Sequence, residues 1–185
     1  MADVSVRPAS LSDASEIGRI QFETWRVGYA EVLPKPVVDA LDPVMMETAW
    51  RMAVQSPPSP RHRVVVASEA AQLVGFAAFG PDDDPQAADP SPETTTAITT
   101  LLVEPRWGRR GHGSRLLAAV TDLARDAGSH RLIAWVPAKD TASLEFYRST
   151  GWAADGVQRS LDTGAGLILE LRLHTGLNWE PEENS

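Results

Sequence analysis

The sequence predicts an α/β fold built on a mixed β-sheet, and three observations support this prediction. The 185 residues are enough for one domain with a substantial core. A β-rich run, an amphipathic helix and a second β-rich run follow one another over residues 94–136, and such a crossover joins parallel strands. Shorter β-rich runs on either side are joined by tight turns, which indicates antiparallel hairpins. The predicted order is β-α-α-β-β-β-α-β-α-β-β.

The first half opens with a short strand, Val4–Arg7, and continues with two helices. Ser10 or Ser12 can cap the first helix, which runs to about Tyr29. Its apolar residues recur at helical spacing: Ile17, Ile20, Trp25 and Tyr29. A second helix is expected from about Val37 to Val54. Its inward positions would be Leu41, Val44, Met45 and Trp50.

A hairpin and a long strand come next. Val64–Ala67 and Leu73–Phe79 are β-rich runs around a turn at Ser68–Gln72. After a loop, the run Thr94–Val103 (TTTAITTLLV) is rich in β-branched residues, and Pro105 ends it. It is the first strand of the crossover.

The second half completes the sheet. The crossover helix, about Gly113–Ala127, carries an apolar face and stops at Gly128. Four further elements are expected: a strand at Leu132–Val136, a short helix at Thr141–Thr150, and a final hairpin of Trp152–Arg159 and Leu167–Leu173. That hairpin would turn through Asp162–Gly166.

Composition excludes several classes of protein. There is no cysteine, which rules out disulfides, thiolate metal sites and a cysteine nucleophile. His62, His130 and His174 are scattered without the spacing of metal ligands, so no metal is expected. No apolar run is long enough for a membrane span, and the opening MADVSVRPAS lacks the pattern of a signal peptide. We therefore expect a cytoplasmic protein without a membrane partner.

The net charge of −8 is concentrated in two segments. Pro81–Glu93 holds five acids and Asn178–Ser185 three, and neither contains a base. These segments are interpreted as a solubilising loop and tail, with attraction of a cationic substrate as the alternative. Four arginines lie close together in 106–115, but no wider basic patch exists, so nucleic-acid binding is not expected.

The segment Leu101–Leu117 (LLVEPRWGRRGHGSRLL) carries the strongest functional signal. A strand ends, a glycine-rich turn follows and a helix begins, so free N–H groups and the helix dipole form an anion site. Gly111 and Gly113 allow close approach of a phosphate, and Arg109 and Arg110 add charged donors. The alternative is a tight turn with solvated arginines.

Two familiar phosphate motifs do not match this turn. An ATP-binding P-loop needs lysine after its last glycine, and Ser114 stands there. A dinucleotide fingerprint needs a third glycine where Leu116 stands, and it lies in a first βαβ unit rather than in the middle of the chain.

The turn resembles the coenzyme A pyrophosphate loop of the GNAT superfamily of acetyl-CoA-dependent N-acyltransferases. That loop reads Gln/Arg-x-x-Gly-x-Gly/Ala after a strand that ends in Val-x-Pro. Val103–Pro105 matches the strand end, and Gly111 and Gly113 match the two small positions. Gly108 occupies the Gln/Arg position, so the two arginines that follow it would supply the charge.

A second segment, Asp140–Trp152 (DTASLEFYRSTGW), resembles the family motif Asn-x-x-Ala/Ser-x-x-Phe-Tyr-x-x-x-Gly-Phe/Trp. Asp140 replaces the usual asparagine. Thr24–Pro34 is similar to the acceptor region of one bacterial branch, so the resemblance spans nearly the whole chain. It implies a GNAT-type three-layer sandwich with a central splayed sheet, comprising residues 1–176 as one domain and 177–185 as an acidic tail.

The resemblance also implies where acetyl-CoA, the cosubstrate, binds. The pantetheine arm would pair with the backbone of Leu101, Leu102 and Val103, where the strand splays from the strand at 132–136. The residues that would hold the pyrophosphate are Arg109, Arg110, Gly111, His112, Gly113 and Ser114. A backbone N–H near Leu102 or Val103 would stabilise the oxyanion. The side chain of His112 is expected to point outward or to pack.

Tyr147 is the candidate general acid for the departing thiolate, and the alternative is a tyrosine that only positions the coenzyme. Asp140 would accept from a pantetheine amide or cap the helix at Thr141. The general base is not identifiable. Glu31, Glu23 and Glu93 are candidates, and the long strand offers only Ala97 and Thr99 where the family often has a glutamate.

An acceptor pocket is expected beside the first helix, from Trp25, Tyr29 and Glu31, although the aromatic residues there also suit a core. Trp107 would cover the loop or the adenine, or be buried. The predicted activity is direct acetyl transfer to a primary amine of a small molecule or peptide. The alternative is a non-catalytic module that senses acyl-CoA. A homodimer is possible.

Overall fold

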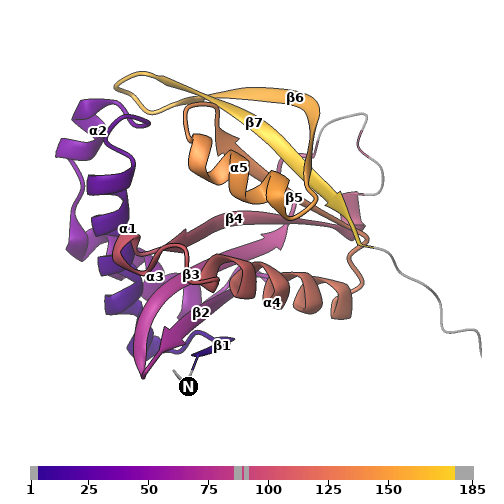
Figure 1. Ribbon diagram of the computed structural model, residues 1–185, viewed down its shortest axis with the longest axis horizontal. Coiled ribbons are helices and arrows are strands. Elements are labelled where there is room, and N and C mark those ends of the chain that lie inside the picture. Colours follow the sequence, from indigo (N-terminus) through magenta and orange to yellow (C-terminus); the bar gives the residue numbers. More distant parts are fainter. Residues whose placement is uncertain (1–3, 86–88, 90–91, 178–185) are drawn as a thin grey trace, which may run out of the picture.

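The computed structural model of the chain describes residues 4–85, 89 and 92–177. A seven-stranded sheet with the order β1-β2-β3-β4-β5-β7-β6 runs through the molecule (Figure 1). The strands are β1 Val4–Pro8, β2 Arg63–Glu69, β3 Gln72–Pro81, β4 Thr95–Val103, β5 Arg131–Pro137, β6 Ala153–Asp162 and β7 Leu167–Gly176. β4 and β5 are parallel and the other neighbours are antiparallel, which confirms the predicted mixed sheet.

Helices cover both faces of the sheet. They are α1 Ala14–Gly28, α2 Lys35–Asp39, α3 Pro43–Gln55, α4 His112–Asp126 and α5 Thr141–Ser149. Apolar residues of α4 and α5 share one core with β2, β3, β5 and β7. Ile17 and Ile20 of α1 build a second core with Phe76 of β3 and Leu102 of β4. Figure 1 shows α1 and α3 together at one end of the molecule, and α4 and α5 beside the two halves of the sheet.

The predicted second helix is in fact two helices, and part of its predicted inward face is wrong. Pro43 begins α3, and Asp42 caps it by accepting hydrogen bonds from the N–H groups of Val44 and Met45. The half-buried face of α3 is formed instead by Met46, Glu47, Trp50, Ala53 and Val54. Val44 and Met45 are 69% and 66% exposed. Leu41 and Trp50 are half-buried, and Trp50 packs edge-on against Phe76.

β4 and β5 pair over only four positions, Thr95–Ile98 with Arg131–Ala134. Beyond them, β4 continues beside β3 alone and β5 beside β7 alone. A β-bulge places Thr99 between the residues paired with Ala78 and Phe79, and the Thr99 hydroxyl donates to the carbonyl of Ala78. Bulges bend and twist a strand. The bulge therefore lies where β4 leaves β5, and the splay expected from the family resemblance is present.

The acidic loop is anchored rather than only solubilising. The Asp89 carboxylate accepts two hydrogen bonds of 2.6 Å from Arg172, whose guanidinium also donates to Asp155 on β6. Arg172 is 3% exposed, so its charge needs these partners.

Near the C-terminus, Leu177 is buried and its N–H donates to the carbonyl of His130. Leu177 thus belongs to the folded domain. The tail beyond it lies outside the described residues.

The β2–β3 turn contains two alanines in the left-handed region, Ala70 with φ 49° and Ala71 with φ 65°. Two consecutive positive φ angles are typical of a type I′ hairpin, which favours Asn-Gly. Ala71→Gly should raise the free energy of unfolding by about 0.5–1 kcal/mol, since glycine avoids the Cβ clash there. Thermal unfolding measures this gain. The matched control Ala49→Gly, on the exposed side of α3, should lower stability instead. Equal effects of both changes would contradict the explanation.

Candidate active site

A cleft opens between β4 and β5 beyond their last paired positions. Its walls are Ile98–Leu102 of β4 and Ala134–Pro137 of β5, completed by residues from both ends of the chain. The remaining lining residues are Trp25, Tyr29, Leu33, Asp140, Ser143, Tyr147, Leu161, Ile168 and Glu170. The splay therefore joins the predicted coenzyme strand, the candidate acid and the predicted acceptor aromatics in one space.

The edge of β4 offers backbone groups to this cleft. The N–H of Glu104 donates to Val74 on β3, and Leu102, two residues earlier, lies opposite Phe76, with Val103 opposite Gly75 between them. Backbone groups of alternate residues point to opposite sides of a strand. Leu101 and Val103 therefore turn their N–H and C=O groups toward the cleft, whereas Leu102 uses its own within the sheet. Of the two predicted oxyanion donors, Val103 has the suitable orientation.

Glu104 fixes the end of β4. Its carboxylate is buried and receives hydrogen bonds from Arg19 on α1, at 3.0 and 3.1 Å, and an ion pair from Arg106 at 2.9 Å. Burial opposes ionisation, but the bonds from Arg19 and Arg106 outweigh it and lower the pKa of Glu104. The loop that follows thus starts from a rigid point attached to α1.

The loop leads into α4 through two left-handed residues, Arg109 with φ 64° and Gly111 with φ 81°. The first helical hydrogen bond runs from the N–H of Arg115 to the carbonyl of Gly111. The N–H groups of His112, Gly113 and Ser114 lie in the first turn, where a helix offers no partner for them. The predicted anion site is therefore a helix N-terminus of the expected kind.

The arginines of the loop have different surroundings. Arg110 stacks on the Trp107 ring at 4.8 Å and lies 3.4 Å from the carboxylate of Glu69. Arg115 donates to the carbonyl of Arg110 at 2.9 Å. Arg109 is exposed, and in the described part of the chain its guanidinium has no partner. Arg109 is thus the loop arginine whose guanidinium is least engaged, which leaves its charge available to a phosphate.

The side chain of His112 is packed in the interior, which is one of the two orientations expected from the sequence. It is 1% exposed, its Nε2 lies 2.8 Å from the Glu69 carboxylate, and its ring meets Trp107 edge-on. Only the backbone N–H of His112 can serve a ligand. Trp107 is half-buried: one part of it packs against the main core, and Arg110 lies over its ring.

Gly113 provides the closest test of fit to a coenzyme. A Cβ at this position would lie 3.3 Å from the Phe146 ring and 3.9 Å from the Val103 side chain. The missing side chain thus allows the start of α4 to pack closely against α5 and the end of β4. The helix N-terminus therefore lies next to the end of β4, the strand whose residues Leu101 and Leu102 line the cleft.

Arg109→Ala should weaken acetyl-CoA binding about 10-fold, since one charge-assisted contact contributes roughly 1.5–3 kcal/mol before solvent screening at this exposed site. The loss should shrink as salt rises. Arg110→Ala serves as the matched control, because its guanidinium is occupied by Trp107 and Glu69. Titration at low and high salt measures both. A larger loss at Arg110 than at Arg109 would contradict the assignment.

Tyr147 lies at the bottom of the cleft. It is 5% exposed and its ring packs against Phe146 and Trp152, with centroids at 5.4 and 4.8 Å. Burial, followed by Coulombic interactions with Tyr29 and Asp140, raises the pKa of Tyr147 above its usual value. The hydroxyl therefore keeps its proton throughout the neutral range and is able to donate it.

Tyr29 and Asp140 bridge the cleft. The Tyr29 hydroxyl donates to Asp140 Oδ2 at 2.7 Å, across 111 positions of sequence. The other carboxylate oxygen, Oδ1, accepts from the N–H of Ser143, so Asp140 caps the helix that begins at Thr141, which confirms one of the two predicted roles. Burial, then the Asp140 charge, raises the pKa of Tyr29. Tyr29 is thus a cleft residue rather than part of a closed core.

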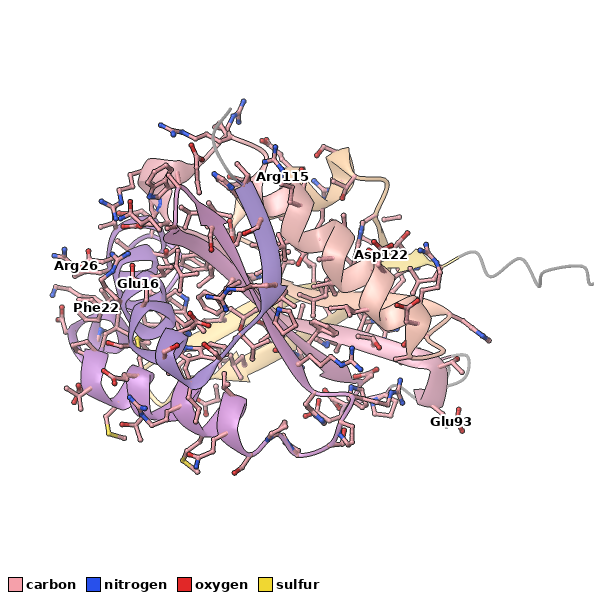
Figure 2. All side chains as sticks on the ribbon, turned by 90° about the horizontal axis from the view of Figure 1, so that it is seen from below. Glu16, Phe22, Arg26, Glu93, Arg115 and Asp122 are labelled. Atoms are coloured by element: carbon pink, nitrogen blue, oxygen red, sulfur yellow. The ribbon has the colours of Figure 1, made fainter. Side chains whose placement is uncertain are left out.

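The carboxylates suggested as bases lie elsewhere. Glu31 is exposed and does not line the cleft. Glu23 pairs with Arg26 on the outer side of α1. Glu93 precedes β4, and Figure 2 shows it well away from Arg115 at the start of α4. The three sequence candidates therefore do not converge on one site.

The sequence analysis missed Glu170 on β7, which lines the cleft and is 8% exposed. Its Oε2 accepts from Arg159 Nε on β6 at 2.7 Å. A signal existed in the run LILELRL, where Glu170 and Arg172 share one face of an otherwise apolar strand. Charged residues at the core positions of a strand need partners, and such positions are enriched in functional groups.

Two further kinds of site were sought. Within residues 4–85, 89 and 92–177, no cluster of three or more His, Cys, Asp or Glu side chains has the arrangement to hold a metal. None of the helices described there combines the length and apolar character needed to span a bilayer.

Comparison with known proteins agrees with the geometry. Residues 23–152 match the model of the acetyltransferase (GNAT) family. The uncharacterized N-acetyltransferase YuaI of Bacillus subtilis (strain 168) is 27% identical over 176 residues, which cover 95% of this chain and 92% of YuaI. The L-amino acid N-acyltransferase MnaT of Escherichia coli (strain K12) is 30% identical over 108 residues, or 58% of this chain and 60% of MnaT. The structure of yncA from Salmonella typhimurium with its cofactor acetyl-CoA superposes with a TM-score of 0.69 at 18% identity, covering 96% of each chain.

Proposed function

Because the chain belongs to the acetyltransferase (GNAT) family, and is therefore an acetyl-CoA-dependent acyltransferase, we propose that it transfers the acetyl group directly to the primary amine of a small molecule or peptide. The observation that carries this proposal is the cleft between β4 and β5, which is lined by Tyr147 and by the hydrogen-bonded pair Tyr29 and Asp140. The cleft offers a strand edge and a proton donor, and β4 in its wall leads through a short loop to the N-terminus of α4.

Different parts of the chain would bind different parts of the cosubstrate. The first-turn N–H groups of His112, Gly113 and Ser114, together with Arg109, would hold the diphosphate. The backbone of Leu101 and Val103 would pair with the amide-bearing arm as a further strand does. When bound, acetyl-CoA supplies the acetyl group as an activated thioester.

Two groups of the chain would act on the reacting atoms. The N–H of Val103 would donate to the carbonyl oxygen as negative charge develops there. Tyr147 would give its proton to the departing sulfur, and burial keeps that proton in place until it is needed. The acceptor would enter from the opposite side, past Trp25, Tyr29 and Glu170.

The cleft favours a small acceptor. Trp25, Leu33, Leu161 and Ile168 give its acceptor side a largely apolar wall, with Glu170 as a charged group beside them. The name of the relative MnaT, an L-amino acid N-acyltransferase, supports free amino acids among the small molecules to be tested.

Release of free thiol from acetyl-CoA, measured against a panel of amino acids, simple amines, polyamines and peptides, tests the proposal. We expect turnover with at least one amine and none with alcohols of the same shape. Mass spectrometry of the product should show one acetyl group on nitrogen. Coenzyme binding without turnover of any amine in the panel would contradict it.

A further inference from the structure

The acceptor side of the cleft contains one carboxylate oxygen that has no hydrogen-bond partner among the described residues. Two carboxylates line the cleft, Asp140 and Glu170. Asp140 uses both oxygens, one for Tyr29 and one for the N–H of Ser143. Glu170 uses only Oε2, for Arg159, and its Oε1 has no partner among the described residues. An ammonium group entering the cleft therefore finds its acceptor at Glu170.

Arg159 lies beside Glu170, and part of its guanidinium is free to donate hydrogen bonds. Its guanidinium lies 4.3 Å from the Trp135 ring centre and is bonded to Glu170, and both of these partners line the cleft. Nε is bound to Glu170, and Nη1 reaches Asp84 only at 3.5 Å. Nη2 has no hydrogen bond within the described chain. The side chain is 37% exposed, so an anion can reach it.

The neighbouring Arg172 shows what a purely structural arginine looks like in this fold. It also faces Trp135, at 5.7 Å, but three hydrogen bonds to Asp89 and Asp155 occupy its guanidinium, and it is almost fully buried. Arg159 and Glu170 differ from Arg172 because each keeps one polar atom without a hydrogen bond among the described residues. In Arg159 this atom is the donor Nη2, and in Glu170 it is the acceptor Oε1.

We propose that the Arg159–Glu170 pair is a subsite for a zwitterionic acceptor, in which Glu170 receives the ammonium and Arg159 the carboxylate of an α-amino acid. This proposal rests on the proposed acetyl transfer and adds the two residues that would select the acceptor. Charges on neighbouring atoms of the ligand match charges on adjacent side chains. A diamine would satisfy Glu170 but would place a second cation near Arg159.

Binding to the protein saturated with CoA tests the subsite without requiring turnover. The probes are L-leucine, L-phenylalanine and L-glutamine, each compared by calorimetric titration with the amine that lacks only the carboxylate. We expect at least one amino acid to bind 10- to 100-fold more tightly than its amine. Arg159→Gln should reduce that ratio to below about 3-fold. Glu170→Gln should weaken both probes about 10-fold or more.

Two variants serve as controls. Arg125→Gln removes an exposed arginine that pairs only with Asp122 on α4, and it should change neither probe. Arg159→Lys keeps the charge but loses the fork, so it should restore part of the ratio. Melting temperatures of all variants identify any that fail to fold.

The outcomes separate the two proposals. No amino acid binding more tightly than its amine, or a preference that survives Arg159→Gln, would overturn the subsite. Turnover of amines or peptides with no such preference would leave acetyl transfer intact. Selective binding of amino acids that depends on Arg159, without thiol release, would support the subsite and contradict the transfer.

Discussion

An aspartate at position 113 is expected to abolish the thermal stabilisation that acetyl-CoA gives to the wild-type protein. Its Cβ would point between Phe146 and Val103, and its carboxylate would stand beside the N–H groups meant for the diphosphate. At a cosubstrate concentration about 100 times the Kd, binding stabilises the native state by about 2.7 kcal/mol. For a chain of this size, that corresponds to a rise in melting temperature of about 5–10 °C, and Gly113→Asp should reduce it to zero.

The matched control is Gly113→Ala, which adds the same Cβ without the charge. Phe146 must then give way by a few tenths of an ångström, so binding should weaken but persist. Without ligand, the aspartate variant should be at least as stable as the alanine variant, since a carboxylate suits the N-terminus of α4. A full thermal shift in the aspartate variant would place the diphosphate away from this helix.

Tyr147→Phe is expected to lower kcat by about 10²–10⁴-fold, the usual contribution of a general acid. Phenylalanine keeps the packing against Phe146 and Trp152 and removes only the proton donor. A thiolate is already a fair leaving group, which favours the lower end of this range. The same burial that raises the pKa of Tyr147 would also raise that of the departing thiol. Proton transfer between them therefore remains feasible.

Steady-state kinetics with saturating acetyl-CoA should show the loss in kcat, while the Kd for the coenzyme changes less than about 10-fold. Tyr29→Phe makes the same chemical change in the other tyrosine of the chain and should act mainly on the acceptor KM and on stability. A tyrosine that only positions the coenzyme would give the reverse pattern, with weaker binding and nearly normal kcat. Full activity of the phenylalanine variant would remove Tyr147 from the chemistry.

Local patterns predicted most of the fold. The β-branched run before Pro105, the amphipathic stretch up to Gly128 and the β-rich run that follows correspond to β4, α4 and β5 within one or two residues. The turn between β4 and α4 was recognisable because its glycines and helix start are neighbours in sequence. Such features depend on interactions between residues a few positions apart.

The parts that could not be predicted depend on distant partners. The bonds from Tyr29 to Asp140, from Arg19 to Glu104 and from Arg172 to Asp89 join residues 83 to 111 positions apart. The role of Glu170 in the cleft is of the same kind, since it follows from how β7 lies beside β5. The error at Val44 and Met45 had a local cause. The Asp42–Pro43 cap was read as helix interior, although aspartate followed by proline is a typical helix start.

The short contact between β4 and β5 has a further consequence for cooperativity. β1–β4 with α1, α3 and α4 form one block, β5–β7 with α5 form another, and only four paired positions join the two blocks within the sheet. Amide groups near this seam should exchange with deuterium through partial opening, at a lower free energy than amide groups inside either block. A ligand bound along the splay would contact both blocks at once and would link them for as long as it stays bound. Occupancy of the cleft should then slow the exchange of amide hydrogens on strands that the ligand does not contact.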